Sequence, residues 1–163
     1  MRILICDDDV VFMDVLRKHV QEYLWEHFIQ SEVIAVTNPV LILNNAERYD
    51  IAFLDIQMGG ADGITLAKKL RERNRKLILF FVTNYDEYQD DAMDLRAFRF
   101  YEKPFDADRL YSGLDKAMEY LDSTYLDVII ASNGSHCRIA ADDICYVTRE
   151  NRKVILVTKE NRY

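Results

Sequence analysis

Residues 51–54 are all apolar and lead directly into Asp55, and a glycine-rich segment, residues 59–63, follows. An apolar run of this length with turn residues behind it predicts a buried strand that ends at the edge of a sheet. Asp55 is therefore expected at the carboxyl end of that strand, where open α/β sheets bind their ligands. A second apolar run, residues 3–6, leads in the same way into three consecutive acids. We expect these two strands to be neighbours and their acids to share one cation.

The rest of the first 122 residues alternates between strand and helix patterns. Apolar residues recur at helical spacing over about 17 residues after Asp9, and Asn38 before Pro39 marks the start of a short second helix. Further strands are expected at 33–36, 77–82 and 98–101, and further helices at 64–70, 86–97 and 110–121. Five such alternations predict an α/β fold with one parallel sheet, right-handed crossovers and helices on both faces. The 86–97 helix has only a thin apolar stripe, so we expect it to be loosely held.

The composition favours a packed protein of a reducing compartment. Half of the 163 residues are apolar, which predicts a folded core rather than disorder. No apolar run approaches the roughly 20 residues that span a bilayer, and the first strand begins directly after Met1-Arg2, which leaves no room for a signal peptide. The cysteines are odd in number and form no Cys-x-x-Cys pair: Cys6, Cys137 and Cys145. We therefore expect a cytoplasmic location and no membrane contact.

The pattern changes after about residue 122. Four short strands are expected at 126–131, 136–139, 144–147 and 154–158, with turn residues between them. We therefore divide the chain into residues 1–122 and residues 123–163, an all-β segment too small to be stable alone. We interpret this segment as part of a truncated second domain, or as a piece that depends on a partner.

The charge differs between the two parts. Residues 1–122 hold 23 acids and 15 bases, a balance of −8, whereas residues 123–163 hold 5 acids and 6 bases, a balance of +1. The first part is therefore unsuited to bind a polyanion through its net charge, while the second part could do so.

Polar side chains stand at the ends of four of the five expected parallel strands: Asp7 and Asp8, Asp55, Thr83 and Lys103. The carboxyl ends of parallel strands meet at one edge of a sheet, so we expect these groups to lie together. Carboxylates at close range raise one another's pKa values unless a cation neutralises them. Oxygen ligands of this kind suit Mg²⁺, and an all-carboxylate cluster disfavours zinc.

The same groups are those that phosphoryl transfer requires. The Asp55 carboxylate can form an aspartyl-phosphate, the Lys103 ammonium supplies a positive charge, and the Thr83 hydroxyl can hydrogen-bond a phosphoryl oxygen. Taken singly, the acids favour helix caps, the threonine a strand end and the lysine a solvated charge. Their joint place at one edge of the sheet favours the functional interpretation.

Four motifs in this order resemble a known family: Asp7-Asp8, residues 55–58 with Gly63 behind them, residues 81–83, and residues 100–105 around Lys103-Pro104. Residues 1–122 resemble the receiver domain of two-component response regulators, which has a flavodoxin-like, doubly wound (βα)5 fold. Residues 126–163 resemble the start of a LytTR-type DNA-binding domain. The resemblance implies a phosphoprotein of a phosphorelay that controls transcription, not an enzyme beyond accepting the phosphoryl group and slowly losing it.

The resemblance also implies residue roles. Asp55 would accept a phosphoryl group from a sensor histidine kinase, Lys103 would pair with that group, and Thr83 would move to bond it. Phe100 would turn inward as the second switch residue, which changes the surface of the 86–97 helix and the following strand. The Lys103-Pro104 peptide would be cis. Four groups would hold Mg²⁺: Asp7, Asp8, Asp55 and the carbonyl of Gln57. The implied partners are the kinase, a second copy of the phosphorylated chain, and DNA through a complete carboxyl-terminal domain.

Two residues depart from the family pattern, and two other functions stay open. Gly59 stands where proline is usual, and Asn84 where a smaller residue is common, so we expect a more mobile loop after Asp55 and narrower access to it. A phosphatase-like enzyme of another fold would need a second acid two residues after the nucleophile, where Gln57 stands. A non-phosphorylated, receiver-like interaction module would not need the intact polar residues of the site.

Overall fold

The computed structural model describes residues 1–59, 61–84, 94–124, 127–132, 135–140, 144–151, 153–158 and 161–163. The chain forms two compact units, Met1–Leu114 and Asp115–Tyr163. Of the helix predicted over 86–97, residues 86–93 lie outside the described residues. The domain boundary predicted at residue 122 stays a prediction, because one helix, residues 107–124, runs through both this position and the division between the units.

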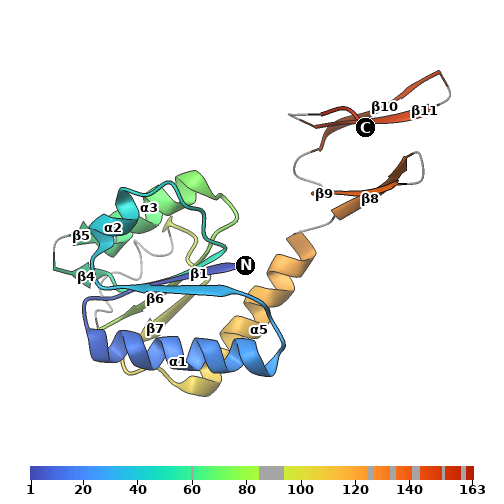
Figure 1. Cartoon of the computed structure of the whole chain (residues 1–163). Coiled ribbons are helices and arrows are strands. Elements are labelled where there is room, and N and C mark those ends of the chain that lie inside the picture. The colour runs from blue at the N-terminus through green and yellow to red at the C-terminus, as the bar shows by residue number, and fades with distance from the viewer. Residues whose placement is uncertain are drawn as a thin grey trace. The chain divides into compact units, whose positions relative to one another are not determined.

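The first unit is built on a five-stranded parallel sheet (Figure 1). Its strands lie in the order β2-β1-β3-β6-β7 and are β1 (Arg2–Cys6), β2 (Glu32–Val36), β3 (Ile51–Leu54), β6 (Ile78–Thr83) and β7 (Arg99–Glu102). β1 and β3 are neighbours, with Cys6 opposite Leu54, so the acids after these strands leave the sheet side by side. The predicted α/β fold with a parallel sheet is confirmed.

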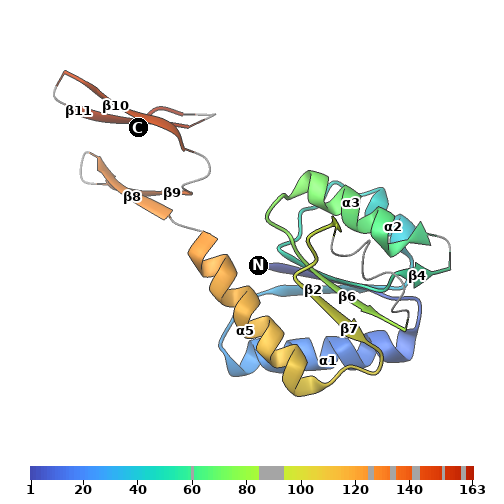
Figure 2. The same cartoon turned by 180° about the vertical axis from the view of Figure 1, so that it is seen from behind.

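The described helices are α1 (Val10–Glu26), α2 (Pro39–Leu43), α3 (Gly63–Arg73) and α5 (Ala107–Thr124). Figures 1 and 2 show α2 and α3 on one face of the sheet, and α1 and the start of α5 on the other. Side chains of Asp9, Asn38 and Asp62 cap α1, α2 and α3 by accepting backbone N–H groups of the first turn. Such a cap satisfies donors that have no partner within the helix, which fixes where each helix begins.

The sheet is buried on both faces. Leu4, with alternate residues of the neighbouring strands, forms one apolar cluster with Ile42 of α2 and Leu66 of α3. Because side chains alternate along a strand, Phe53 and Phe80 face the opposite side, where their rings stack with centroids 4.6 Å apart. Burial of one such side chain contributes roughly 1.5–3 kcal/mol. The buried sheet therefore fixes the positions of the residues that follow its strands.

The segment after Asp55 forms more structure than the predicted glycine-rich turn. β4 (Gln57–Met58) pairs antiparallel with β5 (Ala61–Asp62). The N–H of Gly63 then donates to the carbonyl of Ile56 over 2.8 Å. A Cβ at Gly63 would overlap the carbonyl oxygen of Asp55, so only glycine allows the two backbone segments to approach so closely.

The second unit contains the end of α5 and four strands, β8 (Asp127–Ser132), β9 (Ser135–Ala140), β10 (Ile144–Glu150) and β11 (Lys153–Thr158). The expected all-β segment is confirmed, and its described strands form two separate antiparallel ribbons, β8–β9 and β10–β11. Two-stranded ribbons bury little apolar surface. Accordingly, Tyr146, Val147 and Val154 are 55%, 57% and 69% exposed.

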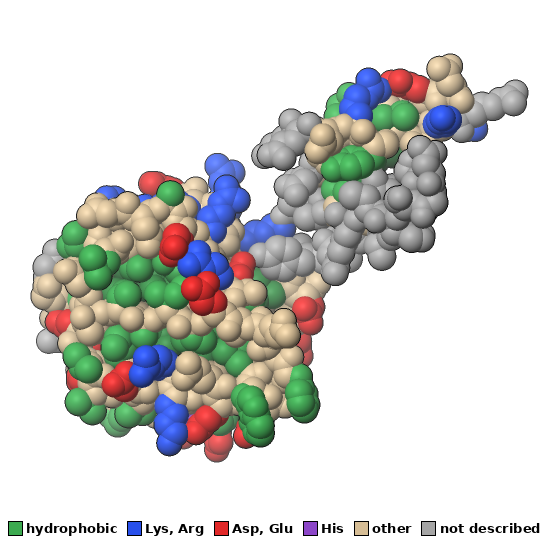
Figure 3. All heavy atoms as spheres, viewed as in Figure 1, with side chains coloured by type: hydrophobic (Ala, Val, Ile, Leu, Met, Phe, Trp, Pro, Cys, Tyr) green, Lys and Arg blue, Asp and Glu red, His purple; other side chains and the backbone are tan. Residues whose placement is uncertain are grey.

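Apolar side chains also remain on the surface around α1. Val11 and Trp25 on this helix, and Phe28 just beyond it, are 75%, 81% and 93% exposed. Figure 3 shows apolar side chains on this side of the first unit, among scattered charged ones. Among the described residues, no helix combines the length and apolar character needed to cross a bilayer.

Candidate functional site

Three carboxylates lie together where β1 and β3 end. One ligand oxygen from each of Asp7, Asp8 and Asp55 lies within 4.8 Å of the other two. Over the described ranges, no other group of three His, Cys, Asp or Glu side chains has such spacing. Asp7 and Asp55 are buried, with 2% and 6% exposed, whereas Asp8 is exposed. The sheet thus holds two of the acids away from water and leaves the third accessible.

One ammonium group faces this cluster. The Nζ atom of Lys103, directly after β7, lies 2.7 Å from Oδ2 of Asp7 and 2.6 Å from Oδ2 of Asp55. The lysine side chain is 7% exposed. The Lys103-Pro104 peptide is cis, as the family resemblance implies. Lys103 thus contacts two of the three acids of this cluster, Asp7 and Asp55.

Burial shifts the pKa values of Asp7 and Cys6, and the contacts of Lys103 with its acids outweigh the effect of burial on its own pKa. It raises the pKa of Asp7, although the Lys103 ammonium opposes that shift. Burial alone would lower the pKa of Lys103, but the hydrogen bonds to Asp55 and Asp7 and the charges of these two acids raise it overall. Burial, aided by the nearby carboxylates, raises the pKa of the Cys6 thiol to about 12. Cys6 therefore stays a neutral thiol at neutral pH, and the charged groups of the site are oxygen and nitrogen atoms.

Backbone donors orient the carboxylates. Each carboxylate accepts one backbone N–H, donated by Asp9 to Asp7 (3.0 Å), by Gly59 to Asp8 (2.9 Å) and by Ile56 to Asp55 (2.6 Å). The bond from Gly59 joins the segment after β3 to the segment after β1. The carboxylates are therefore held in place by the chain before any ligand arrives.

Thr83 ends β6 and is fully buried. Its hydroxyl oxygen has no hydrogen-bond partner in the part of the chain that the structure describes. A buried hydroxyl without a partner costs about 1–3 kcal/mol. The Thr83 hydroxyl is therefore available to form a hydrogen bond with a bound ligand.

The structure leaves the predicted roles of Phe100 and Gln57 untested. Phe100, on β7, is partly buried against the apolar cluster beneath α2 and α3. Gln57, on β4, has an exposed side chain. The switch role of Phe100 and the metal contact of the Gln57 carbonyl stay predictions.

The sequence did not single out Phe12 as a site residue. The centroid of its ring lies 4.5 Å from Nζ of Lys103. Phe12 belongs to the regular apolar pattern of α1, so its spacing indicates only a core residue. Its place four residues after Asp8, in the first turn of the helix, is the one signal that points to the site.

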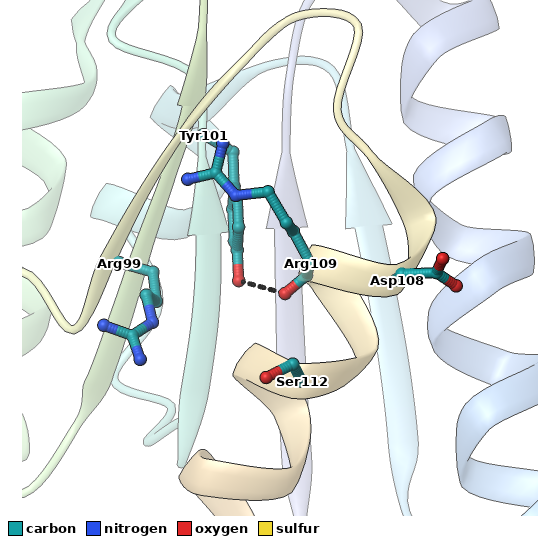
Figure 4. A pocket seen from close by; sticks show the side chains of 5 residues that line it. All are labelled: Arg99, Tyr101, Asp108, Arg109 and Ser112. Carbon is teal, nitrogen blue, oxygen red and sulfur yellow. Dashed lines mark hydrogen bonds between the residues drawn. The ribbon is translucent and has the colours of Figure 1, made fainter.

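A second feature of the first unit is a hollow of about 370 Å³ between β7 and the start of α5. Arg99, Tyr101, Asp108, Arg109 and Ser112 line it (Figure 4). The Tyr101 hydroxyl donates to the carbonyl of Arg109 over 3.0 Å, and Figure 4 shows the Asp108 side chain turned away from both arginines. None of the predicted site residues lines this hollow.

Comparison with known proteins identifies the family. The family model described as the response regulator receiver domain matches residues 3–115. The chain belongs to this family. Sensory transduction protein LytT of Bacillus subtilis (strain 168) is 29% identical over 128 residues, which cover 71% of this chain and 47% of LytT. Sensory transduction protein LytR of Staphylococcus haemolyticus is 28% identical over 144 residues, which cover 88% of this chain and 55% of LytR.

These relatives also bear on the second unit. A match of 144 residues within a chain of 163 necessarily extends past the end of the receiver match at residue 115. The similarity to LytR therefore includes part of the β ribbons and supports a receiver domain followed by a LytTR-type segment. The chain spans about half the length of these two relatives.

A solved receiver structure shares the fold. The response regulator TrrA of Thermotoga maritima, in complex with Mg²⁺-BeF, is 26% identical with a TM-score of 0.60. The match covers 71% of this chain and 97% of TrrA. This agreement confirms the flavodoxin-like receiver fold of the first unit.

Proposed function

We propose that Asp55 is the phosphoryl acceptor of this response regulator receiver domain. One observation carries the proposal: the Asp55 carboxylate lies 2.6 Å from the Lys103 ammonium, within a cluster of three acids. Phosphoryl transfer needs an oxygen nucleophile, fixed positive charge and accurate placement. The backbone bond from Ile56 to Oδ1 of Asp55 supplies part of that placement.

The proposed transfer forms one bond to phosphorus and breaks another. A carboxylate oxygen of Asp55 forms a bond to phosphorus, and the bond between phosphorus and the donor breaks. The donor keeps the electron pair, as histidine in a sensor kinase or as acetate when acetyl phosphate is used. The Lys103 ammonium then pairs with a phosphoryl oxygen, and the buried Thr83 hydroxyl donates to another.

The oxygen donors of this site fit Mg²⁺, which prefers one or two carboxylates, a carbonyl, waters and a phosphoryl oxygen. Asp7, Asp8 and Asp55 would hold the ion together with the carbonyl of Gln57. When bound, Mg²⁺ would neutralise the charge that accumulates between the carboxylates and the phosphoryl group. The Mg²⁺-BeF complex of TrrA supports this assignment by similarity.

The output would lie outside the phosphorylation site. Residues 1–122 would form the receiver domain and residues 123–163 the start of a LytTR-type DNA-binding domain, as the similarity to LytT and LytR suggests. Movement of Thr83 and Phe100 would shift an existing equilibrium at the 86–97 helix and β7. The phosphorylated cytoplasmic protein would then dimerise and, with its complete second domain, bind DNA and control transcription. The chain would turn over no substrate beyond slow loss of its own phosphoryl group.

Incubation with Mg²⁺ and acetyl phosphate, followed by intact-protein mass spectrometry, tests the acceptor. We expect one phosphate adduct per chain, and none in Asp55→Asn. Asp14→Asn is the matched control, since Asp14 is an exposed acid of α1 that pairs with Arg17. An adduct that persists in Asp55→Asn, or a wild type without one, contradicts the proposal.

The second candidate is an interaction module of the same fold that takes no phosphate. The intact cluster weighs against it, because a module without phosphoryl chemistry has no use for three gathered carboxylates and a buried lysine. Sedimentation with and without beryllofluoride and Mg²⁺ separates the two: a switching receiver changes its association, and a passive module does not.

A further inference from the structure

The Lys103 ammonium is held on two sides. Carboxylate oxygens of Asp7 and Asp55 accept its hydrogen bonds at 2.7 and 2.6 Å. The ring of Phe12 also faces it, with the centroid 4.5 Å from Nζ. With 7% of the lysine side chain exposed, little water shares this space. Aromatic faces carry partial negative charge and attract an ammonium, most strongly where water is excluded.

The orientation of the Phe12 ring is itself fixed. The backbone N–H of Phe12 donates to the cap residue Asp9 over 3.1 Å, which sets the first turn of α1. The ring then meets Phe105 edge-on, with centroids 5.5 Å apart and planes at 86°. Phe105 follows Lys103 by two residues and meets His19 in the same edge-on manner at 5.5 Å. The position of the Phe12 ring is therefore fixed by a contact with Phe105, in the same loop as Lys103.

We propose that Phe12 is a positioning residue for Lys103, which keeps the ammonium pointed at the phosphoryl group on Asp55. This inference rests on the proposed function. A third carboxylate beside Lys103 would hold the lysine equally well, but it would repel an incoming phosphoryl group. The ring attracts the ammonium without adding a full negative charge. Its contribution would matter most where Asp7 and Asp55 also hold Mg²⁺ and bind Lys103 less strongly.

Beryllofluoride affinity and the rate of phosphorylation by acetyl phosphate, both with Mg²⁺, test the proposal without a protein partner. Phe12→Leu keeps an apolar side chain but removes the ring, and we expect a loss of about three- to tenfold in both quantities. Phe12→Tyr and Phe12→Trp, which keep an aromatic face, should restore them. Phe28→Leu, the same substitution at a 93% exposed position, is the control and should leave both unchanged.

A double-mutant cycle separates positioning from packing. In a Lys103→Met background, Phe12→Leu should cause no further loss of beryllofluoride affinity, because the ring then has no ammonium to hold. The same loss in both backgrounds, or no loss in Phe12→Leu alone, overturns the proposal. A wild type that takes up neither acetyl phosphate's phosphoryl group nor beryllofluoride overturns the proposed function and this inference with it. If the wild type is phosphorylated and binds beryllofluoride, and Phe12→Leu does both equally well, the inference about Phe12 is overturned and the proposed function stands.

Discussion

The backbone N–H of Lys103 donates a hydrogen bond of 3.0 Å to the carbonyl oxygen of Thr83. This bond continues the ladder between β6 and β7, in which Thr83 lies opposite Glu102. The lysine that would bind a phosphoryl group and the hydroxyl that would bond to it are thus linked through the sheet. Because this hydrogen bond joins the two residues, we expect a shift of either residue to move the other.

Thr83→Val should separate stability from function. Valine has the shape of threonine but lacks the hydroxyl that has no partner in the described residues. We expect the free energy of unfolding without ligand to stay equal or rise by about 1 kcal/mol, since an unsatisfied buried hydroxyl is removed. Beryllofluoride affinity should fall about ten- to hundredfold, because a hydrogen bond to a charged group contributes roughly 1.5–3 kcal/mol. Urea unfolding and a beryllofluoride titration measure the two effects.

Thr83→Ser keeps the hydroxyl, so weak binding in that variant as well would contradict this explanation.

Lys103→Met should make the protein depend on Mg²⁺ for stability. The substitution leaves Asp7 and Asp55, both less than a tenth exposed, without their ammonium partner. Breaking a buried ion pair on one side costs about 3–5 kcal/mol. Added Mg²⁺ should recover more of the free energy of unfolding in the variant than it adds to the wild type, as measured by urea unfolding with Mg²⁺ or EDTA. Lys68→Met, at an exposed lysine of α3, should show the wild-type increment. Equal increments in all three proteins would count against a shared metal and lysine site.

The positions of the acids and of Thr83 could be predicted because each follows an unbroken apolar run. A buried strand delivers the next residue to the edge of the sheet, and neighbouring strands deliver theirs to the same edge. The strand before Lys103 has a weaker apolar pattern, because β7 is short and half exposed, with Arg99 and Glu102 at its ends. The strand expected at 98–101 nevertheless predicted that Lys103 lies at the same edge of the sheet. The pattern of strands therefore predicted the acids, Thr83 and Lys103, and the family resemblance added the expected roles of Gln57 and Phe100.

The remaining features depend on contacts between distant segments. β4 and β5 have two residues each, too few for any periodicity to show. The contact of Phe12 with Lys103 needs α1 to pack against a loop about ninety residues later. α5 extends to Thr124 rather than the predicted 121, because no glycine or proline follows its last apolar turn to stop it.

Tyr101→Phe should have two effects on stability. It removes the hydrogen bond to the Arg109 carbonyl, which contributes about 1 kcal/mol at any pH at which the tyrosine is protonated. It also removes the ionisation of Tyr101, which changes stability only at alkaline pH. Burial raises the pKa of Tyr101, while the guanidinium groups of Arg99 and Arg109 oppose the shift. The folded protein therefore keeps this proton to higher pH than the unfolded chain does. The resulting stabilisation is complete below about pH 10 and is lost as the pH rises through the raised pKa. We expect unfolding free energies to fall less steeply in Tyr101→Phe above that pH, whereas Tyr146→Phe, at an exposed tyrosine, should follow the wild type. Parallel curves for all three proteins would show that Tyr101 carries none of the alkaline loss.

Gly63→Ala should destabilise the protein and displace Asp55. A Cβ at Gly63 would overlap the carbonyl oxygen of Asp55 and crowd the backbone of Ile56, so the start of α3 or the end of β3 has to move. We expect a loss of about 1–3 kcal/mol in the free energy of unfolding, the usual range for overpacking in a core. Asp55 should also accept phosphate from acetyl phosphate more slowly, because its carboxylate shifts relative to Lys103.

Gly59→Ala is the matched control, since a Cβ there would lie 3.6 Å from Oδ2 of Asp8, an ordinary contact. Thermal unfolding and the rate of adduct formation check both variants. If Gly63→Ala proves as stable and as reactive as Gly59→Ala, the close approach of the two backbone segments does not position the acceptor.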